Sequence, residues 1–189
     1  MKKINTLIVA LFVAGTAMAQ TWTLDKAHAK LGFGITHLMI SDVEGSFNTI
    51  DAKFTSSKDD FSDAAIELTA EAGSVNTGNG DRDNHLKGED FFDAAKFTSL
   101  TFKSKSFTKV EGKKYKLVGD LTFHGVTKSV SLDVIVNGPI THPMNKKTVA
   151  GFKVSGTIKR SDFGFGSKYP GAVLSDEVAI TANAEFVKG

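Results

Sequence analysis

The sequence contains no cysteine, few prolines and a single long apolar run. Its 189 residues include 0 Cys and 3 Pro. The lack of cysteine excludes disulfides, thiol catalysis, CxxC redox chemistry and cysteine-based zinc sites. The scarcity of proline excludes a collagenous or proline-rich chain. Stability must therefore come from an apolar core, for which a chain of this length is sufficient as one domain.

The single long apolar run lies at the N-terminus and has the form of an export signal. Two lysines precede a mostly apolar stretch at 4–14, and residues 17–19 form the small-x-small site that a signal peptidase requires. The run is too short for a membrane-spanning helix of ~20 residues. We expect residues 1–19 to be a signal peptide cleaved after Ala19. The mature protein, residues 20–189, is then periplasmic or secreted and not an integral membrane protein.

The mature chain also lacks an excess of charge. The whole chain has 23 Lys+Arg and 21 Asp+Glu, and the signal segment contains two lysines and no acidic residue. Its removal leaves 21 basic and 21 acidic residues. Electrostatic binding of nucleic acid requires an excess of Lys and Arg to meet the phosphates. We therefore expect no nucleic-acid partner.

Most of the mature chain alternates apolar and polar residues with a period of two. This pattern is typical of antiparallel strands with one buried face. The clearest stretches are 29–36, 66–71, 115–123, 130–136, 150–159 and 178–186, with further strands near 22–24 and 98–107. Such strands must close on themselves or pair as a sandwich. We favour an all-β, antiparallel up-and-down barrel of about eight strands, because nearly every strand has a single apolar face. A sandwich is the alternative.

Three irregular features interrupt the strands. The alternation changes phase between Phe47 and Ile50, which predicts a bulge or bend near Asn48–Thr49. One short helix is predicted at 82–87, capped by Asp81 or Asn79 and ended by Gly88 in a left-handed conformation. Residues 137–147 and 161–177 are predicted to be loops, and the second is long enough to suggest a function.

The inward positions of the strands mix phenylalanine with very small residues. Gly119, Gly156, Ala182 and Ala184 all share the inward parity. An eight-stranded barrel can leave room for one small ligand. Burial of ten methylene groups contributes ~8 kcal/mol, so a cavity of this kind favours a lipid over a polar metabolite. The alternative is a filled barrel in which small and large residues alternate to fit the taper.

The densest polar cluster is Asp81-Arg82-Asp83-Asn84-His85. It contains material for acid–base catalysis, but no nucleophile elbow, metal-binding helix motif or nucleotide-binding loop accompanies it. We therefore expect a protein that is not an enzyme and has no metal site and no cofactor. One alternative is an enzyme that acts on a lipid through His85 with Asp81 or Asp83. Another is a capped helix held on the barrel by an Arg82–Asp pair.

Several motifs together resemble one family. They are Trp22-Thr-Leu-Asp25 with Ala27-His28, Arg82-Asp-Asn-His85-Leu-Lys-Gly88 followed by Phe91-Phe92-Asp93, Gly119-Asp-Leu-Thr-Phe-His-Gly125 and Arg160-Ser-Asp-Phe-Gly164. In this order they resemble the YceI-like family over essentially all of residues 20–189. Ala29 and Thr98 depart from residues common in the family. The resemblance implies a lipocalin-like barrel, often periplasmic, that holds a polyisoprenoid or similar amphiphile in an elongated apolar tunnel.

We predict an exported binding protein that carries or stores a long apolar lipid. This lipid is a polyisoprenoid, an isoprenoid quinone or a fatty-acid-like amphiphile. An envelope interaction module with a filled barrel is a further alternative, and a homodimer is left open. The predicted tunnel residues are Phe33, Ile35, Phe47, Leu100, Phe102, Phe123, Leu132, Phe152, Val154 and Ile158. The predicted rim and head-group residues are Arg82, His85, Phe91, Phe92, Arg160, Phe163 and Phe165.

Overall fold

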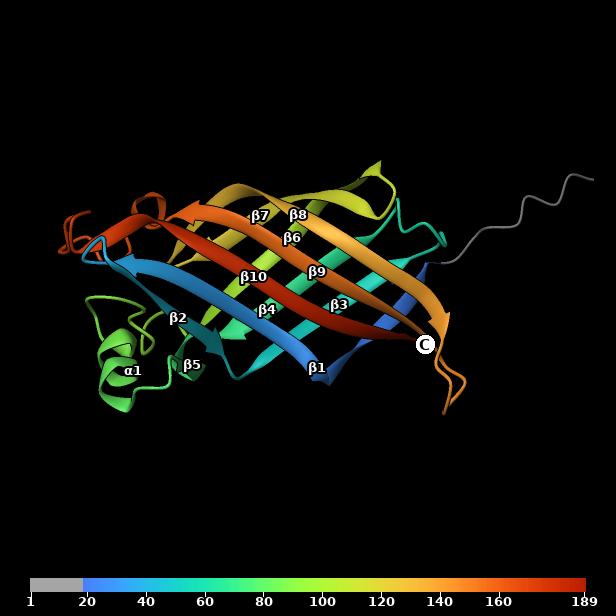
Figure 1. Ribbon diagram of the computed structural model, residues 1–189, viewed down its shortest axis with the longest axis horizontal. Helices are drawn as coiled ribbons and strands as arrows, with labels where there is room; N and C mark the ends of the chain where they lie inside the picture. Colours follow the sequence, from blue (N-terminus) through green and yellow to red (C-terminus); the bar gives the residue numbers. More distant parts are fainter. Residues whose placement is uncertain (1–18) are drawn as a thin grey trace, which may run out of the picture.

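The computed structural model describes residues 19–189 and shows one continuous antiparallel sheet of ten strands (Figure 1). The strands are β1 (Gln20–His37), β2 (Ser41–Phe47), β3 (Ile50–Ser56), β4 (Ala65–Glu71), β5 (Val75–Asn76), β6 (Ser99–Glu111), β7 (Lys114–Phe123), β8 (Val126–Thr141), β9 (Thr148–Lys159) and β10 (Leu174–Lys188). The helical segments are η1 (Ala72–Ser74), α1 (Gly80–Lys87) and η2 (Arg160–Phe163).

The sheet closes into a barrel because β1 pairs with β10. β2 and β3 lie along the same edge of β1: residues 31–37 pair with β2, and residues 20–23 pair with β3. They therefore act as one bent strand in a ring of eight, β1–β2/β3–β4–β6–β7–β8–β9–β10. The predicted up-and-down barrel is confirmed, and the sandwich is not formed. The predicted bend at Asn48–Thr49 separates β2 from β3.

A bulge in β1 explains why two predicted strands are one. Between Asp25 and Lys30 the chain takes five steps, while β10 takes two from Glu185 to Asn183. The three extra residues shift the inward positions from even numbers, such as Trp22, to odd ones, since a side chain changes face with every residue. The loop predicted at residues 137–147 is shorter than expected, because β8 extends through Thr141.

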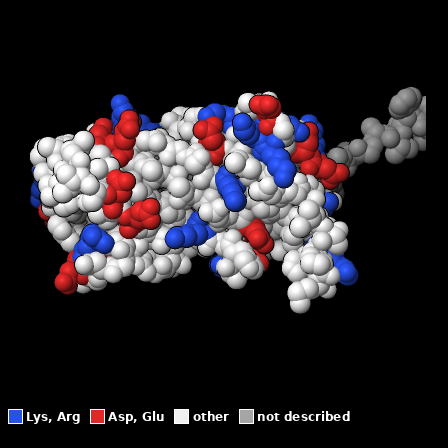
Figure 2. Space-filling model, in the orientation of Figure 1, with Lys and Arg blue, Asp and Glu red and all other residues white. Residues whose placement is uncertain are grey.

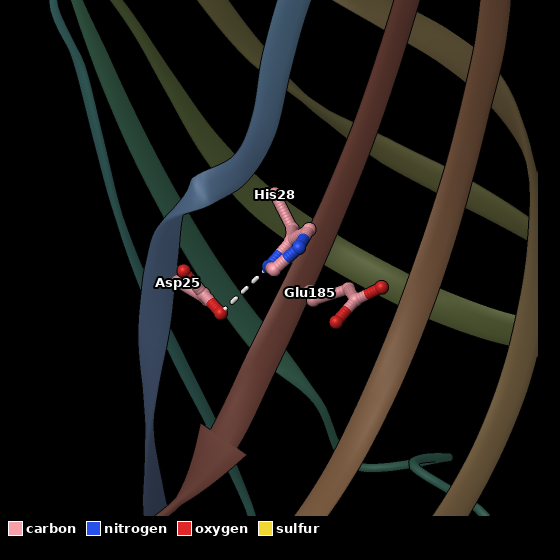
Figure 3. A group of neighbouring side chains, drawn as sticks. All are labelled: Asp25, His28 and Glu185. Atoms are coloured by element: carbon pink, nitrogen blue, oxygen red, sulfur yellow. Dashed lines mark hydrogen bonds and ion pairs between the residues drawn. The ribbon is translucent and has the colours of Figure 1, made fainter.

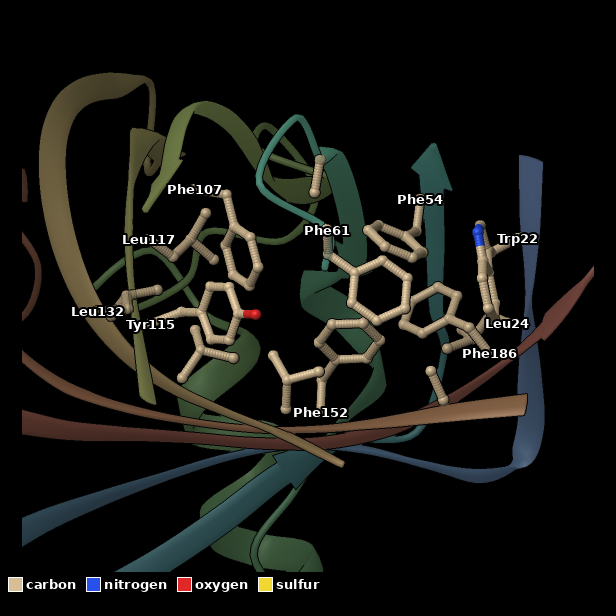
Figure 4. Packing of buried hydrophobic residues seen from close by; sticks show 14 of the residues in the cluster. Trp22, Leu24, Phe54, Phe61, Phe107, Tyr115, Leu117, Leu132, Phe152 and Phe186 are labelled. Carbon is tan, nitrogen blue, oxygen red and sulfur yellow. The ribbon is translucent and has the colours of Figure 1, made fainter. Parts of the chain in front are cut away.

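The core consists of two clusters, one at each end of the barrel axis. At the first end, which we call the closed end, the loop between β3 and β4 places Phe61 among Trp22, Phe54 and Phe152 (Figure 4). The Tyr115 hydroxyl donates a hydrogen bond of 2.8 Å to the Asp60 carbonyl and holds this loop inward. The second cluster lies beside α1, where Phe91, Phe92, Phe123 and Phe165 pack together. None of the helices within residues 19–189 has the length and apolar content needed to cross a membrane.

Candidate ligand-binding cavity

The barrel encloses a cavity of about 460 Å³ between the two clusters. Its wall is almost entirely apolar, as the inward parity of the strands requires. All ten predicted tunnel residues line it: Phe33, Ile35, Phe47, Leu100, Phe102, Phe123, Leu132, Phe152, Val154 and Ile158. The cavity lies in the range of about 300–1,000 Å³ typical of small-molecule sites. An apolar cavity of this kind stays dry, since water would find no polar partners there.

The sequence prediction omitted other wall residues that share the same parity. These include Phe54, Ile66, Leu68, Phe107, Leu117, Ile180, Ala182 and Phe186. Of these, Phe54, Phe107, Leu117 and Phe186 belong to the buried cluster of the closed end and form the floor of the cavity. The alternation in the sequence contained the signal for all of them except Phe107, because a bulge between Ser104 and Ser106 changes the phase of β6 after Phe102. It did not indicate how far along the barrel axis the void extends.

The small inward residues divide into two kinds. A Cβ at Gly119 would come within 2.4 Å of Phe102 Cζ, and a Cβ at Gly156 would come within 2.5 Å of Leu132 Cδ2. These two glycines are therefore covered by larger side chains of neighbouring strands. In contrast, Ala182 lines the cavity, so its small volume leaves space for a ligand.

The open end of the cavity is formed by residues from separate segments. His37 and Val43 come from the β1–β2 hairpin, His85 from α1, and Tyr169 and Val173 from the loop between η2 and β10. His85 is exposed, whereas the others are half-buried. We call this ring of five residues the mouth. Its loop residues, Tyr169 and Val173, follow no regular period, so no pattern in the sequence indicated them.

Helix α1 is fixed by Thr77 and not by an Arg–Asp pair. Its N-cap is Asn79, whose side chain accepts a hydrogen bond from the Arg82 amide. Arg82 donates from Nε to Thr77 Oγ1 at 2.7 Å and from Nη2 to the Thr77 carbonyl. The Thr77 hydroxyl and amide in turn hydrogen-bond to Asp83, and these bonds lower the pKa of the Asp83 carboxyl. Gly88 ends the helix with φ −73°, so the predicted left-handed conformation is wrong.

His85 has aromatic neighbours and no carboxylate partner within residues 19–189. Its Nε2 lies 3.3 Å from the Tyr169 hydroxyl, and its ring meets that of Phe91 edge-on at 5.0 Å. Neither Asp81 nor Asp83 is hydrogen-bonded to the imidazole. A base needs such an orienting partner or a substrate proton within reach. The dyad that the enzyme alternative requires is therefore not formed.

The predicted rim residues divide between the cavity wall and the protein core. Phe91, Phe92 and Phe165 are buried and line the cavity beneath α1. Arg82 and His85 also line it, from the exposed side. Phe163 does not line the cavity. It is 1% exposed and packs behind the wall against Phe123, with ring centroids 5.5 Å apart.

Arg160 lines the cavity, but its hydrogen-bond donors are directed to backbone carbonyls. Its side chain is buried at 6% exposure. All five of its N–H donors are used, and the acceptors are the carbonyls of Phe165, Gly166, Tyr169, Leu174 and Ser175. A guanidinium has five donors and no acceptor, so none remains for a ligand. Its role is to hold the loop that carries Tyr169 and Val173 at the mouth.

A polar group lies on the outer wall at the β1 bulge (Figure 3). Asp25 faces Glu185 directly across the β1–β10 pair, and His28 points between them from the bulge. His28 Nδ1 lies 2.9 Å from Asp25 Oδ2; this hydrogen bond raises the pKa of His28 and lowers that of Asp25. Like charges opposite each other destabilise a strand pair, so a protonated His28 compensates the two carboxylates. This group lies away from the cavity, and we interpret it as an ion pair that offsets the charge of the two carboxylates at the bulge.

With this geometry established, the chain can be compared with known proteins. Residues 22–186 match the YceI-like domain. The chain belongs to the YceI-like family. A UPF0312 protein of Staphylococcus aureus (strain N315) is 40% identical over 169 residues, which cover 87% of this YceI-like chain and 96% of that protein.

Solved structures agree with this assignment. The crystal structure of the Campylobacter jejuni YCEI protein is 38% identical, has a TM-score of 0.74 and covers 88% of this chain and 97% of that one. A polyisoprenoid binding domain from Saccharophagus degradans, implicated in plant cell wall breakdown, superposes with a TM-score of 0.67 at 16% identity, over 90% of this chain and 99% of that one. The latter similarity shows the fold alone. The predicted family and barrel fold are confirmed.

Proposed function

We propose that this protein binds one long apolar lipid in the barrel cavity and carries or stores it. The observation that supports this most strongly is the void of about 460 Å³ with an apolar wall. Each methylene group moved from water into such a wall contributes about 0.8 kcal/mol, so a chain of ten or more groups offsets much of the association cost. A polyisoprenoid or isoprenoid quinone fits this chemistry, and the Saccharophagus degradans neighbour is a polyisoprenoid binding domain.

The polar end of such a lipid would meet Arg82 and His85 at the open end. Arg82 uses Nε and Nη2 on Thr77, and no protein partner is assigned to its Nη1 within residues 19–189. The His85 imidazole lies beside Tyr169 with its ring edge open to solvent. Both groups can donate hydrogen bonds to a hydroxyl, carbonyl or phosphate oxygen. The binding function needs no metal and no cofactor.

We further propose that residues 1–19 direct export and are removed. These residues, apart from Ala19, lie outside the described part of the chain. β1 begins at Gln20, so cleavage after Ala19 would leave the barrel intact. N-terminal sequencing of protein isolated from a bacterial periplasm is expected to start at Gln20. A start at Met1 in protein recovered from the cytoplasm would contradict export.

The binding proposal is tested by identifying what the protein carries. Native mass spectrometry after gentle purification is expected to show one additional hydrophobic mass per chain. A matched pair of variants on β10 tests the location: Ala182→Phe fills the cavity from inside, and Ala179→Phe adds the same ring on the exposed face. We expect lipid loss only in Ala182→Phe. The proposal fails if the wild type carries nothing and takes up neither prenyl lipid nor quinone.

A further inference from the structure

Three exposed apolar side chains form the tip of the β1–β2 hairpin. Leu38, Met39 and Ile40 are 48%, 65% and 82% exposed. They follow directly on His37, which belongs to the mouth, and the Leu38 amide donates a hydrogen bond of 2.8 Å to the Val173 carbonyl, also at the mouth. The tip is therefore continuous with the opening of the cavity. An exposed apolar patch in this position indicates an interaction site.

The backbone conformation of the tip shows that Leu38 and Met39 are unfavourable residues for the turn that they form. Leu38 and Met39 have φ of 50° and 58°, and the Ile40 amide bonds the His37 carbonyl. Two successive positive φ values favour Asn-Gly, because bulky side chains are strained in the left-handed region. The β7–β8 turn of the same barrel has glycine, Gly125, at the second such position. Leu38 and Met39 thus make the turn harder to form, although they remain 48% and 65% exposed.

The surroundings of the tip carry almost no charge. The hairpin tip has no charged residue, and residues 164–173 contain only Lys168, which is paired with Asp90. The left end of the molecule in Figure 2, where these two segments lie, shows few charged side chains. On the hairpin, the nearest acidic residue is Asp42, whose carboxylate accepts a hydrogen bond from Thr36. The tip itself is therefore suited to a neutral apolar surface, whereas Arg82 of α1 places a positive charge elsewhere on the open end.

We propose that the Leu38–Ile40 tip inserts into the surface of an electrically neutral lipid bilayer and brings the mouth against it. Stable protein–protein complexes typically bury about 800 Å² on each partner, more than three side chains on a narrow hairpin can supply. A bilayer needs no matching shape, and partly inserted apolar side chains are sufficient for reversible binding. The inference rests on the proposed function, because contact with a bilayer serves a protein whose ligand leaves or enters one. It adds the place at which that exchange occurs.

The test uses sedimentation of the full chain with vesicles of neutral phosphatidylcholine. The variant Leu38→Asn/Met39→Gly/Ile40→Ser removes the apolar tip and supplies the turn with its preferred residues. We expect its vesicle affinity to fall about tenfold or more, since each buried methylene contributes to binding, while its midpoint of unfolding is equal or higher. The matched control is Met144→Ser, because Met144 is 86% exposed in the β8–β9 loop, away from the mouth. This control is expected to bind like the wild type.

A fluorescence variant reports insertion directly. Trp22 is the single tryptophan and is buried at the closed end, so its signal provides a constant background. Tryptophan in Ile40→Trp should shift to shorter wavelength on neutral vesicles, and tryptophan in Met144→Trp should not. Binding should persist at high salt, because screening weakens charge interactions and not apolar insertion.

Three outcomes would overturn the proposal. The first is a tip variant that binds vesicles as tightly as the wild type. The second is wild-type binding that requires anionic lipid and disappears at high salt. The third is a tip variant that loses a homodimer but binds vesicles unchanged. Loading with prenyl lipid from detergent solution separates this proposal from the proposed function. A tip variant that loads normally from detergent but slowly from vesicles supports the tip. A wild type that binds vesicles but never holds lipid refutes only the cavity function.

Discussion

The two ends of the barrel are built from the same strands but differ in how their interiors are packed. At the closed end, Phe54 and Phe61 are each 1% exposed. Their ring centroids lie 5.3–5.7 Å from each other and from that of Trp22. At the open end, His85 and the hairpin tip are exposed and the wall surrounds a void. The closed end is filled by aromatic side chains, whereas the buried cluster of the open end packs around the void and leaves the cavity unsealed.

The largest expected difference between the ends is the response to removing one phenyl ring. Phe61→Ala should lower the free energy of unfolding by about 3–5 kcal/mol, because Phe61 is 1% exposed, packs against Trp22 and Phe54, and does not line the cavity. Phe33→Ala at the cavity wall should cost clearly less, since one side of that ring already faces the void. Urea unfolding of both variants measures the difference. Equal losses would show that the open end contributes as much as the closed end.

The next effect concerns Arg160, the anchor of the open end. Arg160→Lys keeps the charge but cannot reproduce five donors in a planar fork. We expect a loss of about 2–3 kcal/mol, because several buried carbonyls lose charge-assisted hydrogen bonds. Amide hydrogen exchange should become faster at residues 165–174. The amides of the closed end should still exchange only through global unfolding. Lipid binding retained at full strength with a disordered loop would show that this segment does not shape the mouth.

A smaller, pH-dependent effect is expected at the closed end. Burial raises the pKa of Asp63, but hydrogen bonds from Ser56, Ser57 and two backbone amides outweigh it and hold the pKa well below the usual 3.8. A depressed carboxyl pKa stabilises the fold above the unfolded pKa, and this contribution is lost as the pH falls through the folded pKa.

Asp63→Asn should therefore destabilise the protein at pH 7, and the gap to the wild type should narrow below about pH 3.8. Trp22 fluorescence reports the transition, because Trp22 packs against Phe61 of the same loop. A gap that stays constant down to pH 2 would show that the carboxylate is not the source of the effect.

The smallest effect is expected on the outer wall. His28→Ala removes the ion pair at the β1 bulge, where Asp25, His28 and Glu185 all have access to water. Solvent-exposed ion pairs contribute little to the free energy of unfolding. We expect no measurable change in the unfolding midpoint at pH 7. In an NMR titration, Asp25→Asn should lower the pKa of His28, because the hydrogen bond to Asp25 is the main cause of its rise. An unchanged His28 titration would assign the rise to Glu185 instead.

Much of the fold could be predicted because strand geometry is local. The period of two identified the inward face of each strand, and the phase change at Asn48–Thr49 identified the bend. The merging of residues 22–24 and 29–36 into β1 could not be predicted, because the bulge that joins them is defined by pairing with β10. The role of Arg160 also depended on partners up to 15 residues away in a loop without a regular pattern.

Within each regular stretch of strand, the sequence alone determined which side chains face the interior, because successive residues of an extended chain point to opposite sides. Only the tertiary structure decided which of these positions are filled. Gly119 and Gly156 are covered by Phe102 and Leu132 of neighbouring strands, whereas Ala182 faces open space. The physical reason is that the volume at an inward position depends on the register and the side chains of adjacent strands, which no local pattern contains.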